Sequence, residues 1–145
     1  MTLSQEDIDL IRTSFISLSA NLQHAGDVFY ETLFEIAPHT RDLFLQDMAS
    51  QSVKLMSTLG LVVSQLQNAG ELEPIVKDLA LRHLAYGVEK EHYFIVREAL
   101  ITMLRTVLDA QHPEAVFAAW TRAYDGLANV MIEAAYPERS LQMHA

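Results

Sequence analysis

Apolar residues recur every three or four positions along most of the chain, the spacing that gathers them on one face of an α-helix. Strict alternation of apolar and polar residues, which is typical of strands, is not sustained anywhere. The pattern therefore predicts an all-α protein with six main helices and a short turn through Leu43-Phe44. The main helices are expected from Ser4, over about 22–36, over about 50–67, from Pro74 to Gly87, from about Glu91, and after Pro113.

Capping and turn residues mark several of the predicted helix ends. Ser4 stands three residues before Asp7, a variant of the capping box that begins many helices. Gly70 is expected to close the 50–67 helix in the left-handed conformation, and Pro74 to be the first residue of the next helix. Gly87 is the expected C-terminal cap of that next helix.

The inward faces of the predicted helices are expected to form one core. A chain of 145 residues, half of them apolar, is long enough to bury such a core as a single domain over 1–145. The expected core residues are Ile8, Ile11, Phe15, Leu18, Phe29, Leu33, Leu55, Leu59, Val62, Leu66, Ile75, Val76, Leu79, Tyr93, Val96, Leu100, Met103, Leu104, Val107, Val116, Trp120, Tyr124, Leu127 and Met131.

Composition and charge exclude several functional classes. The absence of cysteine removes disulfide scaffolds and thiolate zinc sites. Ten Lys and Arg against 19 Asp and Glu give a net charge of −9, which disfavours nucleic acids and anionic membranes as partners. The first residues lack the pattern of an export signal, and the apolar run 115–120 is too short to span a bilayer. We expect a cytoplasmic protein whose polar tail, 136–145, frays.

One histidine stands out as a candidate for chemistry. His83 continues the apolar face that Val76 and Leu79 form, so it is either a core histidine bonded to a carbonyl or a metal or haem ligand. No His-Glu-x-x-His motif or acidic calcium loop is present, and the pair Glu89 and His92 is too little for a di-iron centre. A haem site needs only one histidine, because the porphyrin supplies four ligands. Spacing alone leaves both interpretations of His83 open.

Five short stretches resemble a known family, in the same order along the chain. They are Phe29–Phe34 (FYETLF), Ala37–Phe44 (APHTRDLF), Leu81–Val88 (LRHLAYGV), His92-Tyr93 with Ile95-Val96, and Ala119-Trp120 with Ala123-Tyr124. From about 4 to 136 the chain is similar to single-domain bacterial haemoglobins and to the globin domain of flavohaemoglobins. The resemblance implies a globin fold with haem b in a pocket between the 50–67 and 74–87 segments.

The resemblance also implies which residues hold the haem. His83 matches the proximal iron ligand, and Phe44 matches the ring that stacks on the haem after the corner that begins at Pro38. Val88 belongs to the matching proximal stretch. Arg82 and Lys54 match positions that pair with the haem propionates; the alternative for both is a solvated surface charge.

On the opposite, ligand-binding side, three positions match the family. Tyr30 and Gln51 match residues that donate hydrogen bonds to the bound ligand, and Leu55 matches an apolar residue that presses on the ligand site. A core tyrosine bonded to the backbone and a solvent-facing glutamine are the alternatives. Gly26 and Ser52 are expected where two helices cross closely, since small residues permit that approach.

On the proximal side the match is incomplete. Tyr93 matches a tyrosine that, with a glutamate, surrounds the proximal histidine in flavohaemoglobins. At the position of that glutamate this chain has Ala135, and Glu133 lies two residues earlier on another helical face. The other histidines are expected to be surface or cap residues: His24, His39, His92, His112 and His144.

The expected function is reversible, high-affinity binding of oxygen and other diatomic ligands such as NO and CO. The alternative is a nitric oxide dioxygenase that makes nitrate and depends on a separate reductase. A gas sensor and a haem-free interaction domain are further alternatives. Composition and motifs do not determine the oligomeric state.

Overall fold

The structure is a computed structural model that describes residues 3–44, 47–108 and 112–136. Within these ranges the chain forms six α-helices and two 3₁₀ helices, and no strand. They are α1 (Gln5–Leu18), η1 (Ser19–Asn21), α2 (Leu22–Ile36), η2 (Pro38–Leu43), α3 (Met48–Ser64), α4 (Ala69–Ala85), α5 (His92–Val107) and α6 (Glu114–Ala135). The all-α prediction is confirmed, and the expected short corner is η2.

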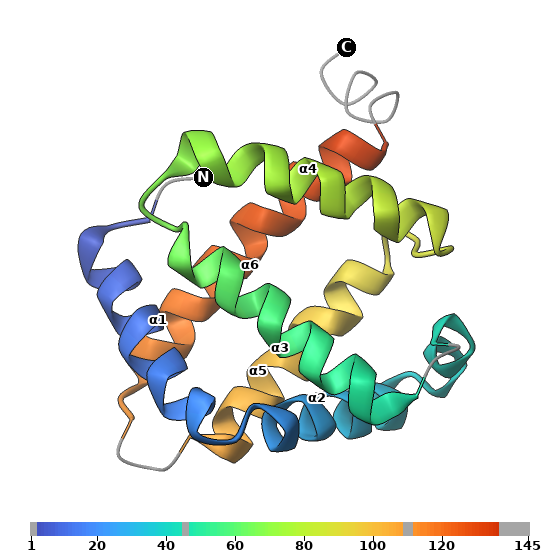
Figure 1. Ribbon diagram of the computed structural model, residues 1–145, viewed down its shortest axis with the longest axis horizontal. Helices are drawn as coiled ribbons and strands as arrows, with labels where there is room; N and C mark the ends of the chain where they lie inside the picture. Colours follow the sequence, from blue (N-terminus) through green and yellow to red (C-terminus); the bar gives the residue numbers. More distant parts are fainter. Residues whose placement is uncertain (1–2, 45–46, 109–111, 137–145) are drawn as a thin grey trace.

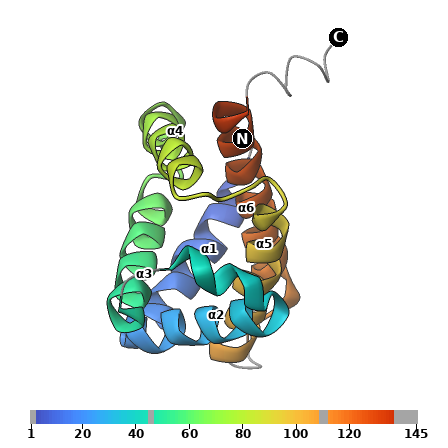
Figure 2. The ribbon, with the colours of Figure 1, turned by 90° about the vertical axis from the view of Figure 1, so that its right-hand side faces the viewer.

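The helices cross one another rather than run side by side. In Figure 1, α2 and α4 lie at opposite ends of the molecule, with α3 in front of α5 and α6. Figure 2 shows α3 and α4 on one side, α5 and α6 on the other, and α2 closing one end. The main packing partners are α2 with α3 and α5, and α6 with α4 and α1. No helix of the described ranges is both long and apolar enough to cross a membrane.

The core holds apolar residues from all six helices, as the spacing predicted. Trp120 is buried, and its indole N–H donates to the hydroxyl of Ser14 over 2.8 Å, which satisfies the one polar atom of that ring. Tyr124 is half-buried against the core. The sequence did not predict the ion pair between Asp7 and Arg122, which joins α1 to α6 by two hydrogen bonds of 2.6 and 3.0 Å.

Two of the predicted caps are confirmed. The hydroxyl of Ser4 accepts the N–H of Asp7 at 3.0 Å and caps α1. Gly87 has a φ of +90°, and the N–H of Val88 donates to the carbonyl of His83 at 3.0 Å. This pair of features is the Schellman motif that commonly ends a helix.

The predictions for Gly70 and Pro74 are wrong. Gly70 does not take a positive φ, and both residues lie inside α4, which begins at Ala69. The additional turn forms because Leu72 is buried in the core, and this contact extends the helix before Pro74. Helix α3 correspondingly ends at Ser64 instead of about Gln67.

The other end of α3 also differs from the expected boundary. Helix α3 begins at Met48, because the carboxylate of Asp47 accepts the N–H of Ser50 at 3.1 Å and caps it there. The expected polar tail lies outside the described residues, except for Tyr136.

Candidate functional site

His83 lies near the C-terminal end of α4 and is half-buried. Its Nδ1 atom is 2.7 Å from the carbonyl oxygen of Leu79, one turn earlier. Because a carbonyl can only accept, Nδ1 carries the proton, and Nε2 keeps its lone pair. Burial lowers the pKa of His83, although the bond to Leu79 opposes this effect, so the ring stays neutral. A core histidine and a metal-ligating histidine would both make this bond; only a ligand also needs a free Nε2 lone pair.

The C-terminal end of α4, just after His83, is fixed by hydrogen bonds. The Schellman motif at Gly87 sets the direction of the chain, and the hydroxyl of Tyr136 donates to the carbonyl of Val88 at 2.9 Å. Around it, several large apolar side chains remain exposed: Leu81, Leu84, Tyr86 and Phe94. Val88 is therefore held from α6 by a hydrogen bond rather than by a packed core.

The two expected propionate partners lie on the surface. Arg82 pairs with Asp78 one turn earlier at 3.0 Å, and both side chains are more than half exposed. Lys54 is exposed on α3. Exposure of both side chains is compatible with either interpretation, and the exposed pair of Arg82 with Asp78 contributes little to stability.

Tyr30 is buried in α2 within a group of aromatic rings. The rings of Phe29 and Phe44 lie edge-on to it, with centroids 5.1 and 5.0 Å away, and Phe34 is tilted at 6.0 Å. Burial raises the pKa of Tyr30 to about 12. Its hydroxyl is a hydrogen-bond donor at neutral pH, as that of any tyrosine is, because the usual pKa is already about 10. Phe44, expected against the haem, is thus half-buried and packed beside Tyr30.

Helices α2 and α3 cross at a close contact beside Tyr30. A Cβ atom on Gly26 would lie 2.6 Å from the Cβ of Ser52, which only a glycine avoids. The hydroxyl of Ser52 also donates to the carboxylate of Asp27 over 2.6 Å. The predicted close crossing at Gly26 and Ser52 is confirmed.

Two further predicted positions lie on α3, near its N-terminal end. Gln51 is half-buried in the first turn, where its N–H donates to the carbonyl of Asp47 at 3.0 Å. Leu55 lies one turn later, partly buried against the core. The two therefore share one face of the helix, as the spacing predicted.

Tyr93 is buried at the start of α5 and also has a raised pKa, about 12, mainly because of burial and also because of Tyr136. Its carbonyl accepts a hydrogen bond from the hydroxyl of Tyr124. Glu133 is exposed on α6, and Ala135 is half-buried.

His92, predicted with the other histidines to be a surface or cap residue, is a cap, and it is buried rather than on the surface. Its Nδ1 accepts the N–H of Glu89 at 2.8 Å, which caps the turn before α5, and its ring lies 5.9 Å from the ring of His39. His24 and His39 are exposed, and His112 is half-buried. His144 lies outside the described residues.

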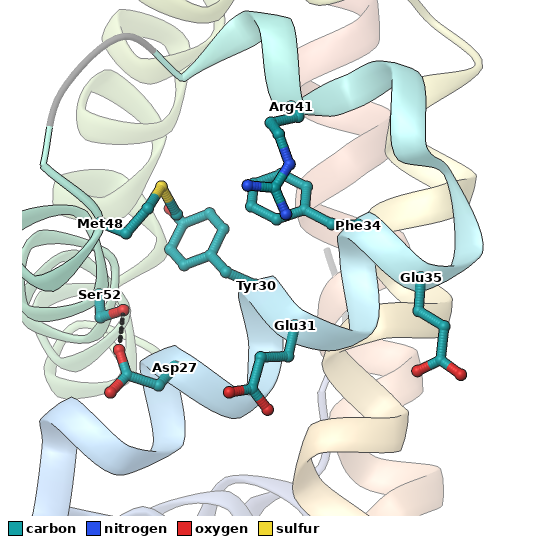
Figure 3. Close-up of a pocket in the computed structure, with 8 residues that line it drawn as sticks. All are labelled: Asp27, Tyr30, Glu31, Phe34, Glu35, Arg41, Met48 and Ser52. Atoms are coloured by element: carbon teal, nitrogen blue, oxygen red, sulfur yellow. Dashed lines mark hydrogen bonds between the residues drawn. The ribbon is translucent and has the colours of Figure 1, made fainter.

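A pocket of about 440 Å³ opens beside Tyr30 on the outer side of α2. Its walls come from α2, η2 and α3: Asp27, Tyr30, Glu31, Phe34, Glu35, Arg41, Met48 and Ser52. Figure 3 shows the three carboxylates along one edge of α2, whereas Tyr30, Phe34, Met48 and Arg41 gather on the other side. The guanidinium of Arg41 lies 4.5 Å above the Phe34 ring. No motif or spacing pointed to Arg41 or Met48, since pocket walls depend on how the helices cross.

Comparison with known proteins identifies relatives over the whole helical region. The Globin family profile matches residues 27–131. The chain is 31% identical to an uncharacterized globin-like protein of Aquifex aeolicus, over 90% of this chain and 92% of the other. It is 28% identical to a flavohemoprotein of Rhizobium meliloti, covering 95% of this chain but 36% of that longer protein.

Solved structures give the same picture. A candidate nitric oxide dioxygenase of Rhodothermus marinus, engineered as a carbene transferase, superimposes with a TM-score of 0.84 at 29% identity, over 98% of this chain and 99% of that one. The myoglobin of Aplysia limacina shares the fold with a TM-score of 0.83 at 24% identity, over 93% of this chain and 99% of that one.

Proposed function

The chain belongs to the globin family, and from this premise we propose that it holds haem b and binds oxygen and other diatomic gases reversibly and with high affinity. Globins as a family bind haem and small gaseous ligands, and the relatives include a leghemoglobin of Lupinus luteus and a neuroglobin of Tetraodon nigroviridis. The residues that would carry this function on the present chain are His83 on α4 and Tyr30 with Gln51 on the α2 and α3 side.

The observation that carries the proposal is that Nε2 of His83 makes no hydrogen bond to any described residue, while Nδ1 is bonded to the carbonyl of Leu79. With Nδ1 donating to Leu79, the free Nε2 lone pair is the atom that would ligate iron, and the lowered pKa of His83 keeps that atom unprotonated. The chain has no cysteine, so a thioether-linked haem has no attachment point in it. These features fit a non-covalently held haem b.

On the other side, Tyr30 would stabilise the ligand by donating a hydrogen bond. Haem, when bound, supplies the iron that takes up the gas and the electron density that gives oxygen a partial negative charge. A hydrogen bond to such a charged acceptor is worth about 1.5–3 kcal/mol, or about one to two decades in affinity. The Tyr30 hydroxyl is protonated at neutral pH and would donate this bond, and Gln51 would add a second donor.

The test is the visible absorption spectrum of the haem-reconstituted protein, recorded ferric, dithionite-reduced and with CO. We expect one haem per chain, a five-coordinate ferrous form, and conversion to a sharp CO complex. His83→Ala should lose this spectrum, whereas His24→Ala, at an exposed histidine of α2, should retain it. Failure to bind haem stoichiometrically, or an unchanged spectrum in His83→Ala, would contradict the proposal.

A second candidate function is nitric oxide dioxygenase, favoured by the likeness to the Rhodothermus marinus protein and to flavohemoproteins. The reaction combines NO, oxygen and one electron to give nitrate, so repeated turnover requires a reductase that supplies this electron. Nitrate measured per chain distinguishes the two functions. Many equivalents in the presence of reductase would support the dioxygenase, and a single equivalent would leave only gas binding or scavenging.

A further inference from the structure

The contact between α2 and α3 is tight at one point and open at the next turn. At Gly26 and Ser52 the backbones approach so closely that no side chain fits between them. The bond from Ser52 to Asp27 fixes the crossing there. One turn further along α2 lies Tyr30, and one turn earlier along α3 lies Met48, and between these two the pocket opens. The crossing therefore acts as a fixed point beyond which the two helices diverge.

The inner wall of this pocket is formed by Tyr30, Phe34 and Met48. Tyr30 is only 6% exposed, yet its hydroxyl makes no hydrogen bond to any residue that the structure describes. In the same part of the chain, every fully buried side-chain oxygen or nitrogen has a partner. The Tyr30 hydroxyl must therefore face accessible space, and in Figure 3 it lies at the Met48 end of the pocket.

The outer edge of the pocket is charged. Asp27, Glu31 and Glu35 line the α2 side, while the one cation, Arg41, lies over the Phe34 ring. Carboxylates at an opening disfavour anions and leave neutral molecules unaffected. Diatomic gases are neutral, and they are small enough to pass between the side chains of a pocket that is wide enough for water.

We propose that this pocket is an access route by which small neutral gases reach the hydroxyl of Tyr30, and that Met48 sets its width. The inference rests on the proposed function, because it supplies that function with a path for its ligand. The path would run from the exposed edge of the pocket at Glu31 to the wall that Tyr30, Phe34 and Met48 form. Narrowing the mouth should slow ligand association, and shortening Met48 should speed it.

The kinetic test measures CO recombination with the ferrous haem protein after flash photolysis. Glu31→Trp places a large ring at the mouth, and we expect the bimolecular rate to fall by about tenfold. Met48→Ala should raise the same rate severalfold. The matched control is Gln23→Trp, an exposed α2 position outside the pocket, which should leave the rate unchanged. Equal rates in all four proteins, or equal slowing in both tryptophan variants, would overturn the inference.

A second experiment follows dissolved oxygen directly, in protein whose porphyrin carries zinc in place of iron. In protein loaded with zinc protoporphyrin, dissolved oxygen should enhance the relaxation of the Met48 methyl protons more than that of Met56, which is 0% exposed. Glu31→Trp should reduce the enhancement at Met48 severalfold, and Gln23→Trp should not. An enhancement that Glu31→Trp leaves unaltered would contradict the route.

The two proposals fail in distinguishable ways. If the wild-type chain forms no CO complex with haem, the proposed function fails. If the complex forms and His83→Ala abolishes it, but the Glu31 and Met48 variants associate with CO at the wild-type rate, only the access route fails.

Discussion

The two regions proposed to face the haem are built by different means. Where α2 crosses α3, side chains fix the geometry: Gly26 touches Ser52, Ser52 donates to Asp27, and Tyr30 is enclosed by aromatic rings. At the C-terminal end of α4, hydrogen bonds fix the geometry instead. There the Schellman motif and the bond from Tyr136 hold Val88, while Leu84 is 41% exposed.

Under the proposed function, this difference means that one fold places the two proposed functional groups with different tolerances. A hydrogen-bond donor to a ligand must be located accurately, because such a bond weakens steeply with distance and angle. The packed crossing provides that accuracy for Tyr30. The ring of His83 needs a fixed tautomer, which a single bond to the carbonyl of Leu79 provides without dense packing.

The largest expected effect is at the crossing. Gly26→Ala places a Cβ within 2.8 Å of the Ser52 backbone, so α3 must shift, and we expect the free energy of unfolding to fall by about 3 kcal/mol. Gly70→Ala in α4 is the matched control. Nothing lies within 4 Å of its added methyl, and helix propensity predicts a gain of about 0.5 kcal/mol.

Urea unfolding of both glycine variants provides the measurement. Equal changes in the two midpoints would contradict the tight packing at Gly26. A fall in stability confined to Gly26→Ala would support it.

The next effect concerns ligand release. Tyr30→Phe keeps the ring in its aromatic surroundings but removes the donor, so oxygen should dissociate about tenfold faster or more. CO release should change less, because bound CO gains less from a hydrogen bond. Stopped-flow displacement of each gas measures both rates, and equal acceleration of the two would contradict the hydrogen-bond argument.

The smallest effect appears at alkaline pH and compares both regions directly. Burial raises the pKa of Tyr30 and of Tyr93 from 10.0 to about 12 in the folded protein. Above pH 10 the unfolded chain releases these protons first, so stability falls as pH rises toward 12. Tyr30→Phe and Tyr93→Phe should each make this decline shallower, whereas Tyr86→Phe, at a residue 64% exposed, serves as the control.

Denaturant titrations at several pH values between 9 and about 11.5 would reveal these slopes. A slope that no substitution alters would show that neither phenol is protected by burial. A change in only one of the two variants would show that the two regions differ in solvent access.

Most of the fold could be predicted because helical spacing reports burial directly. Ile11, Leu33 and Met103 each belong to a series of apolar residues at helical spacing in their own helix, and all three are fully buried. The boundary near Pro74 was predicted wrongly, because proline is a local signal, whereas the additional turn of α4 depends on Leu72 reaching the core. Local chemistry determines how a helix can begin, and packing selects where it does begin.

The candidate site divides in the same way. The sequence by itself determined the all-α architecture and the cap at Gly87, because these follow from spacing and backbone freedom, and its resemblance to globins located the crossing at Gly26. Only the tertiary structure decided that His92 is buried, and that Arg41 and Met48 share a pocket with Tyr30. These facts depend on side chains from separate helices meeting in space, and no local pattern encodes the angle at which two helices cross.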